Sequence, residues 1–142
     1  IGDTEHPVTI IFEGGFYKMA NIPLEYKWSK FYLERDPIKE KEAFDKINLS
    51  EDEEYIFIHE SKDRKVYKNI NNNIRKIHPD NMDLSIFDYL YVIEKAKEVH
   101  VMNSSFMNLI DCMQLQNQRL FYHEYARPGI DPTLKLNWTI IK

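Results

Sequence analysis

Glycine is scarce in this sequence, and its scarcity excludes common phosphate-binding loops. Only four glycines occur in 142 residues, and they form neither a P-loop nor a G-x-G-x-x-G turn. The G-x-S-x-G segment that holds the nucleophile of α/β-hydrolases is also missing. Two His-Glu pairs, at His59 and His123, begin like the zinc motif H-E-x-x-H but lack its second histidine. Neither pair can therefore bind zinc in that way.

Cysteine, basic charge and long apolar runs are also in short supply. The single cysteine, Cys112, excludes an internal disulfide bond and indicates a reducing compartment. No apolar run approaches the ~20 residues of a membrane-spanning helix, and no signal peptide is visible. The net charge of −4 argues against a nucleic-acid binder, which usually has a basic face. We therefore expect a cytoplasmic protein that does not cross a membrane, and a membrane-peripheral position stays open.

What the sequence does contain is an alternation of short apolar strands with amphipathic helices. Its length fits one domain. The pattern predicts strands over 54–59, 98–102 and 119–125, and helices over 84–97 and 104–116. Strands that alternate with helices predict an α/β fold with one parallel sheet and right-handed crossovers.

Further elements are predicted on either side of this alternation. Pro23 divides residues 16–33 into two short helices. Asp36 and Pro37 begin a helix that runs to about Ile47, because Asp caps the first turn and Pro needs no amide partner there. The remaining predictions are short β segments: 8–12, two pieces within 66–77, and an edge strand over 134–140.

The stretch from Ile93 to Asp111 resembles a ligand-binding element. It contains the end of a helix, a short strand, and a new helix that begins after Asn103 and Ser104. A helix start just past a strand's carboxyl end gathers free N–H groups and positive dipole where open α/β folds bind phosphate. An ordinary capped helix without a ligand accounts for the same residues, and the spacing leaves both interpretations open.

His59 ends a predicted strand, and Arg64 follows it in a polar loop. Because the carboxyl ends of parallel strands share one edge of a sheet, we expect Arg64 and the helix start at Ser104 to converge on one anionic group. A solvated loop with a purely structural role is the alternative. Cys112, on the apolar stripe of its helix, and His100, within a strand, are both predicted to be core residues.

These segments resemble the C-terminal half of GT-B glycosyltransferases, as found in heptosyltransferases and α1,6-fucosyltransferases. The similar residues are Y-I-F-I-H with Arg64 downstream, and I-F-D-Y-L-Y-V-I-E-K-A-K-E-V-H-V-M-N-S-S-F-M-N-L-I-D, within residues 54–125. In heptosyltransferases a D-S-G-x-x-H-L-A segment follows such a strand and meets the donor phosphates. Asn103, Ser104 and Ser105 stand here in the place of its Asp, Ser and Gly. The fucosyltransferases carry a strand that ends in His with Arg after it, which His59 and Arg64 resemble at longer spacing.

The resemblance implies a Rossmann-like domain that binds the nucleotide-sugar donor of a metal-independent glycosyltransferase. It implies that the serines and the helix start hold the diphosphate, while Arg64 neutralises it. The implied partners are a nucleoside-diphosphate sugar and a surface glycan or polysaccharide acceptor, with no cofactor and no metal. The implied donor-site residues are His59, Arg64, Asn103, Ser104, Ser105 and Phe106. No catalytic residue is identified.

The same resemblance divides the chain into two parts. Residues 48–142 would form the nucleotide-sugar-binding domain, and residues 1–47 a helical or linker segment that ends a missing acceptor domain. Since the chain begins with Ile1 rather than Met, whether it is a fragment stays open. The alternative to a glycosyltransferase is a non-enzymatic α/β module that binds a nucleotide or a protein partner.

Overall fold

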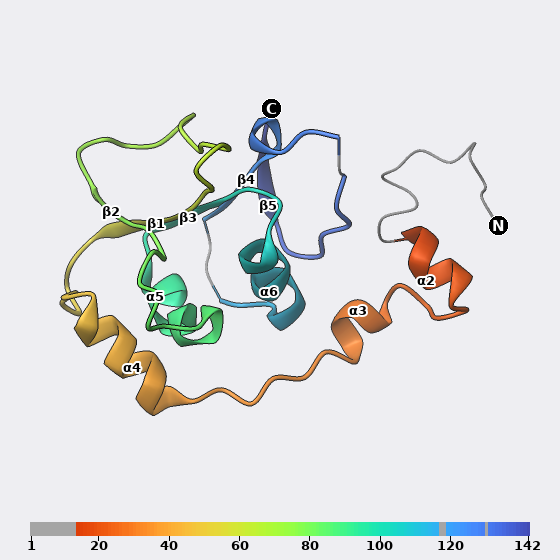
Figure 1. Ribbon diagram of the computed structural model, residues 1–142, viewed down its shortest axis with the longest axis horizontal. Coiled ribbons are helices and arrows are strands. Elements are labelled where there is room, and N and C mark those ends of the chain that lie inside the picture. The colour runs from red at the N-terminus through yellow and green to blue at the C-terminus, as the bar shows by residue number, and fades with distance from the viewer. Residues whose placement is uncertain (1–13, 117–118, 130) are drawn as a thin grey trace.

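Residues 14–116, 119–129 and 131–142 are described by the computed structural model. Their five strands form one parallel sheet in the order β2-β1-β3-β4-β5 (Figure 1). In register, Ile56 lies opposite Glu98, and Val99 lies opposite Leu120. The predicted Rossmann-like α/β fold with parallel strands is therefore confirmed. The strands are β1 (Tyr55–His59), β2 (Arg75–Ile77), β3 (Glu98–Val101), β4 (Leu120–His123) and β5 (Trp138–Ile141).

Helices cover one face of the sheet, and a loop covers the other. In Figure 1, α4, α5 and α6 lie below the strands, whereas the loop 60–74 that joins β1 to β2 lies above them. None of the helices among the described residues is long and apolar enough to cross a membrane. The helices are α2 (Phe16–Met19), α3 (Tyr26–Ser29), α4 (Pro37–Lys46), α5 (Leu90–Lys95) and α6 (Ser105–Met113), with short 3-10 helices η2 (Ile86–Tyr89) and η3 (Glu124–Ala126).

The hydrophobic core is divided by the sheet, because successive strand residues point to opposite faces. On the helix side, Phe57 of β1 packs with Tyr89 and with Phe106 of α6, at ring-centroid distances of 6.2 and 5.5 Å. On the loop side, Ile56 and Ile58 form a smaller cluster that includes Val66 and Met102. The larger core therefore attaches α6 firmly to β1.

Helix α4 begins where the sequence predicts. Asp36 Oδ1 accepts a hydrogen bond from the Lys39 amide at 3.1 Å, and Pro37 occupies the first helical position. Glu40 is almost fully buried, and its carboxylate pairs with the Arg35 guanidinium. Arg35 also pairs with Glu94 of α5 at 2.6 Å. The buried charge is thus neutralised, and the pKa of Arg35 is raised chiefly by its hydrogen bond to Glu40.

The helix predicted over 84–97 is shorter and is divided in two. Ser85 and Asp88 form a capping box that begins η2, and α5 follows from Leu90. Ala96 adopts extended backbone angles, and the Lys97 amide then donates to the Tyr55 carbonyl at 2.9 Å. The chain leaves the helix there because it must pair with β1.

The helix predicted over 104–116 also ends early, at Met113. Gln114 takes a left-handed backbone (φ 53°), and the Leu115 amide donates to the Ile110 carbonyl at 3.2 Å. Cys112 lies in this last turn and is only half-buried, so its assignment to the core is wrong in that respect.

Several strand predictions need correction. The strand predicted over 119–125 ends at His123, because η3 turns the chain away from the sheet. Only the second β piece within 66–77 forms a strand, β2, and the alternating segment 134–140 contributes β5 only from Trp138. Edge strand β5 pairs with β4 alone, as predicted. The strand predicted over 8–12 lies outside the described residues.

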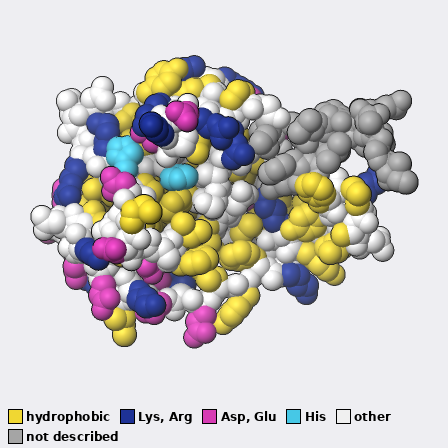
Figure 2. Space-filling model, in the orientation of Figure 1, with side chains coloured by type: hydrophobic (Ala, Val, Ile, Leu, Met, Phe, Trp, Pro, Cys, Tyr) yellow, Lys and Arg dark blue, Asp and Glu magenta, His cyan; other side chains and the backbone are white. Residues whose placement is uncertain are grey.

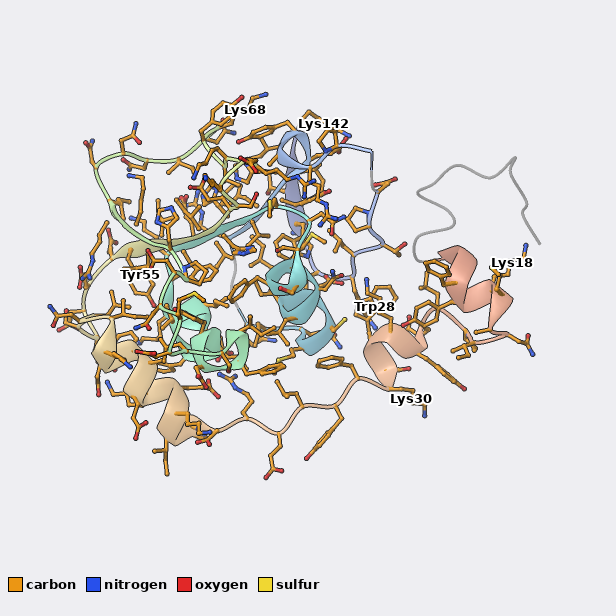
Figure 3. The ribbon with its side chains drawn as sticks, in the orientation of Figure 1. Lys18, Trp28, Lys30, Tyr55, Lys68 and Lys142 are labelled. Atoms are coloured by element: carbon orange, nitrogen blue, oxygen red, sulfur yellow. The ribbon has the colours of Figure 1, made fainter. Side chains whose placement is uncertain are left out.

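The segment before α4 forms the two short helices that Pro23 predicts, and α3 is held against α6. The Trp28 indole donates to Asp111 Oδ2 at 2.7 Å (Figure 3). Nearby, Lys27 Nζ donates to the Thr133 carbonyl at 3.0 Å, and Lys135 pairs with Glu25 at 2.8 Å. Residues far apart in sequence thus attach this segment to the sheet domain.

Candidate functional site

The carboxyl ends of β1 and β3 lie side by side, and the chain continues from them on opposite faces of the sheet. From β1 it passes to β2 over the loop face, while from β3 it enters α6 on the helix face (Figure 1). Open α/β sheets bind ligands outside the carboxyl ends of strands at such a reversal of strand order. The topology therefore selects the edge where His59 and Ser104 lie.

His59 and Ser104 meet at this edge. His59 Nδ1 lies 3.0 Å from Ser104 Oγ, and the His59 ring contacts Phe106 at a centroid distance of 4.6 Å. Burial lowers the pKa of His59, partly opposed by the Glu60 carboxylate. The imidazole is therefore neutral at pH 7, and it serves the site as a hydrogen-bonding group rather than as a cation.

Ser104 caps α6 as predicted. Its hydroxyl oxygen accepts from the Met107 amide at 3.4 Å. The amides of Ser105 and Phe106, also in the first turn, have no partner within the helix. The Ser105 side chain is exposed, whereas Phe106 is buried among core rings. The first turn thus offers N–H donors, while Phe106 serves to position the turn.

Two asparagines beside this helix start have unsatisfied polar atoms. Asn103 is 3% exposed, and its Nδ2 has no hydrogen-bond partner in the part of the chain that the structure describes. Asn108 Nδ2 donates to the Ser104 carbonyl at 3.1 Å, yet its Oδ1 is buried without a partner among the same residues. Such groups are few in native proteins, and a bound ligand or water is one explanation.

Arg64 and Arg127 both follow strands that end at this edge. Arg64 lies on an exposed turn whose backbone bonds to Ser61 at 3.1 and 3.3 Å. No hydrogen bond or ion pair joins its guanidinium to Ser104 within the described ranges, so their convergence stays a prediction. Arg127 is half-buried, and its Nη1 donates to the Asn103 carbonyl at 3.2 Å. The structure thus attaches Arg127 to the end of β3.

A chain of buried titratable groups crosses the loop face of the sheet. His100 Nε2 lies 2.9 Å from Glu98 Oε2, and His100 Nδ1 lies 2.8 Å from His123 Nε2. His123 Nδ1 lies 3.0 Å from the Tyr125 hydroxyl, which also accepts from the amides of Tyr67 and Lys68 at 2.8 and 2.9 Å. The prediction that His100 is a satisfied core residue is confirmed, since it is fully buried.

These contacts determine the protonation of both histidines. The Tyr125 oxygen already accepts two amide hydrogens, so its own proton goes to His123 Nδ1. His123 must then donate from Nε2 to His100 Nδ1, and His100 donates from Nε2 to the Glu98 carboxylate. Both rings are neutral, and burial lowers the pKa of each. The chain fixes Tyr125 and, through it, the loop that carries Arg64.

Sequence reasoning missed Arg127 and this chain of histidines. Arg127 follows β4 just as Arg64 follows β1, so the same rule about carboxyl ends could have found it. On β3, the spacing of Glu98 with His100 marks polar residues on a single face, and in the sequence His123 and Tyr125 have the same spacing, although Tyr125 lies in η3 just after β4. That pattern was visible in the sequence, but the pairing of the strands was not.

Comparison with known protein families, curated proteins and solved structures finds no match for this chain. Its chemistry therefore has to be inferred from the site itself. Among the described residues, no group of three or more His, Cys, Asp or Glu side chains is placed to hold a metal ion. The edge instead presents N–H donors and the Arg127 guanidinium, which suit an anion.

Proposed function

We propose that this domain binds a nucleoside-diphosphate sugar at the carboxyl ends of β1 and β3. One observation carries the proposal: His59 and Ser104 meet at 3.0 Å at the reversal of strand order, where α6 begins. Open α/β folds bind nucleotides at that location, and the first-turn amides of a helix stabilise phosphate charge.

Each residue at this edge has its own role in binding the ligand. The α6 start, with Ser104 and Ser105, would donate hydrogen bonds to the diphosphate. His59, neutral and in contact with Phe106, would bind as a donor or acceptor of fixed orientation. The resemblance gives Arg64, carried by the loop after β1, the role of neutralising the diphosphate as it leaves, although the structure bonds Arg127 rather than Arg64 to the residue before the α6 cap. These roles lower the cost of charge development on the leaving group, which is the main contribution a donor domain makes to glycosyl transfer.

The assignment to a metal-independent glycosyltransferase of surface glycan or polysaccharide synthesis comes from the resemblance of residues 54–125 to a GT-B donor half. In that scheme the acceptor glycan binds a second domain, which commonly supplies the catalytic base. The donor half contributes binding and leaving-group stabilisation.

A thermal-shift screen with GDP-, UDP-, ADP- and dTDP-linked sugars tests the proposal. A ligand that binds only the folded state stabilises it by roughly 2.7 kcal/mol at a concentration of one hundred times Kd. We expect one nucleotide series to raise the melting temperature. In calorimetric titration, Ser104→Ala should lower the affinity for that ligand. Ser50→Ala is the control, because Ser50 is exposed and far from this edge in sequence, and it should leave the affinity unchanged. Equal affinities for both variants would remove the donor-site assignment.

The alternative, a protein-binding module, is favoured by the surface of α2 and α3. Figure 2 shows hydrophobic side chains gathered there, and Phe16 and Met19 of α2 are 56% and 76% exposed, with Tyr26 of α3 46% exposed. Exposed apolar patches often mark protein contacts. If no nucleotide sugar raises the melting temperature, this interpretation replaces the donor site.

A further inference from the structure

We infer that Arg127, rather than Arg64, is the cation that binds the diphosphate, and that Asn103 binds with it. The identity of the complete ligand rests on the proposed function, but the diphosphate site can be tested by itself. Arg127 follows η3, beyond the carboxyl end of β4, and its side chain bonds to the residue before the α6 cap.

The first observation is the position of the Arg127 guanidinium. Its Nη1 donates to the backbone carbonyl of Asn103, the residue directly before the α6 cap. The side chain is half-buried, and no carboxylate pairs with it among the residues that the structure describes. One bond thus orients the guanidinium, and no other hydrogen bond or ion pair of its N–H groups occurs among the described residues. An arginine of this kind can bind a phosphate through two parallel hydrogen bonds.

The second observation is the unsatisfied amide of Asn103. The residue is 3% exposed, and its Nδ2 donates to no described atom. The same residue therefore holds Arg127 with its backbone and presents a buried donor with its side chain. Together with the first-turn amides of α6, these donors lie in the segments that follow two neighbouring strands, β3 and β4. A diphosphate matches these donors, because at neutral pH its oxygens act almost entirely as hydrogen-bond acceptors.

Asn108 refines the class of ligand. Its Oδ1 is a buried acceptor without a partner in the described part of the chain, one turn along α6 from Ser104. A phosphate oxygen cannot satisfy an acceptor, whereas a sugar or ribose hydroxyl can. The set of orphan atoms thus matches a diphosphate that is attached to a hydroxyl-bearing group, and inorganic pyrophosphate should satisfy only part of it.

The test is calorimetric titration of the chain with inorganic pyrophosphate and with UDP-, GDP-, ADP- and dTDP-sugars. We expect Arg127→Ala to weaken pyrophosphate at least tenfold, as the loss of a charged hydrogen bond typically does. Arg127→Lys should recover part of the lost affinity, since lysine restores the positive charge but cannot donate two parallel hydrogen bonds. Arg64→Ala tests the competing cation that the resemblance implies, and if Arg127 is the cation it should change affinity less than threefold. Unchanged melting temperatures would show that all three variants fold.

A second pair of variants tests the asparagines. Asn103→Asp replaces the buried donor with a carboxylate of the same charge sign as pyrophosphate, and should abolish pyrophosphate binding. Asn108→Ala should lower the affinity for the nucleotide sugar and leave the affinity for pyrophosphate unchanged. If Arg127→Ala binds pyrophosphate as tightly as the wild type, or if Arg64→Ala loses as much, the inference is wrong.

The outcomes separate this inference from the proposed function. Pyrophosphate binding that depends on Arg127, without binding of any nucleotide sugar, supports the diphosphate site and removes the donor role. Nucleotide-sugar binding that survives Arg127→Ala supports the donor role and removes Arg127. If the wild type binds neither probe, both proposals fail.

Discussion

Asp111 shows how a single buried carboxylate can organise distant parts of this chain. It is fully buried, and its oxygens accept from the indoles of Trp28 and Trp138 at 2.7 and 2.9 Å. They also accept from the amides of Lys135 and Leu136 at 2.9 to 3.0 Å. Four donors from two distant segments, residue 28 and residues 135–138, therefore replace the water that a carboxylate normally needs. The carboxylate fixes α3, α6 and the approach to β5 relative to each other.

Replacing this carboxylate tests its role. Asp111→Asn exchanges one oxygen for an NH₂ group, which would face N–H donors and leave at least one of them unpaired. We expect unfolding free energy to fall by about 2–3 kcal/mol, measured by urea denaturation. Asp45→Asn is the control, because that side chain is 62% exposed, and it should change stability by less than about 0.5 kcal/mol. Similar small effects in both variants would show that Asp111 is dispensable.

The buried histidines predict a loss of stability in mild acid. The pKa of His123 is lowered to about 3, chiefly by burial and additionally by the nearby charges of His100 and Lys68. In the unfolded chain the pKa is near 6.5, so between these values only the unfolded state binds the proton. The contribution of His123 to stability is therefore complete above about pH 6.5 and decreases as pH falls toward 3.

Denaturation at pH 7 and pH 5 measures this effect. The stability of the wild type should fall by about 2 kcal/mol for His123 alone. His123→Gln keeps a donor for His100 and an acceptor for Tyr125 but does not titrate, so its loss between the two pH values should be smaller by that amount. An identical loss in the variant would assign the acid sensitivity to other groups.

At the scale of elements, the start of α6 combines stability with binding. Ser104 accepts the first-turn amide of Met107 and contacts His59. Ser105, one residue on, is exposed and begins the helix. Ser104 and Ser105 therefore have different structural roles, although they are adjacent in sequence. The residue pattern alone could not tell which of them caps the helix.

These roles predict different costs of removing the two hydroxyls. Ser104→Ala should lower the unfolding free energy by about 1 kcal/mol, because an N-cap is lost. Ser104→Asp should recover the cap, and Ser105→Ala should stay within about 0.5 kcal/mol of the wild type. Thermal unfolding followed by circular dichroism would measure all three. A larger cost at Ser105 would mean that the cap is assigned to the wrong residue.

At the scale of the whole molecule, β3 lies at the centre of the sheet. All four of its residues are buried, and it pairs with β1 on one side and β4 on the other. The outer strands β2 and β5 each have one neighbour. The fold thus places its most protected strand directly before the candidate site, so that α6 begins from a fixed support.

Hydrogen exchange tests this order of protection. Amides of β3 should exchange slowest, at a rate set by global unfolding, and those of β2 and β5 faster, by local opening. Amides of α2, which has no buried residue, should exchange fastest among the described helices. Mass spectrometry of proteolytic fragments would resolve these segments. Slower exchange in β5 than in β3 would contradict the assigned strand order.

Much of the fold could be predicted because local chemistry decides it. Asp36 and Pro37 specify the start of α4, and the apolar run from Tyr55 specifies a buried strand. Both signals are local and do not depend on distant residues. Element ends were less predictable. Ala96 and Gln114 end their helices because neighbouring strands and turns require it, and helix propensity alone would have continued both.

The candidate site was predicted in part. The loops after His59 and Met102 were expected at one edge of the sheet, and the contact of His59 with Ser104 at 3.0 Å agrees with that rule, whereas the convergence of Arg64 with Ser104 stays a prediction. Arg127 follows the predicted strand in the same way, but its bond to the Asn103 carbonyl depends on the pairing of β3 with β4, which the sequence does not show. The orphan atoms of Asn103 and Asn108 could not be foreseen, because burial depends on packing.

The sequence by itself determined the α/β class, the parallel sheet and the capped start of α6, since periodicity and capping act within a few residues. Only the tertiary structure decided which distant side chains meet. Strand order brings His100 to His123 and the Arg127 guanidinium to the Asn103 carbonyl, and packing brings two tryptophans to Asp111. The physical reason is that such contacts depend on how the elements are arranged in space, which no local pattern of residues specifies.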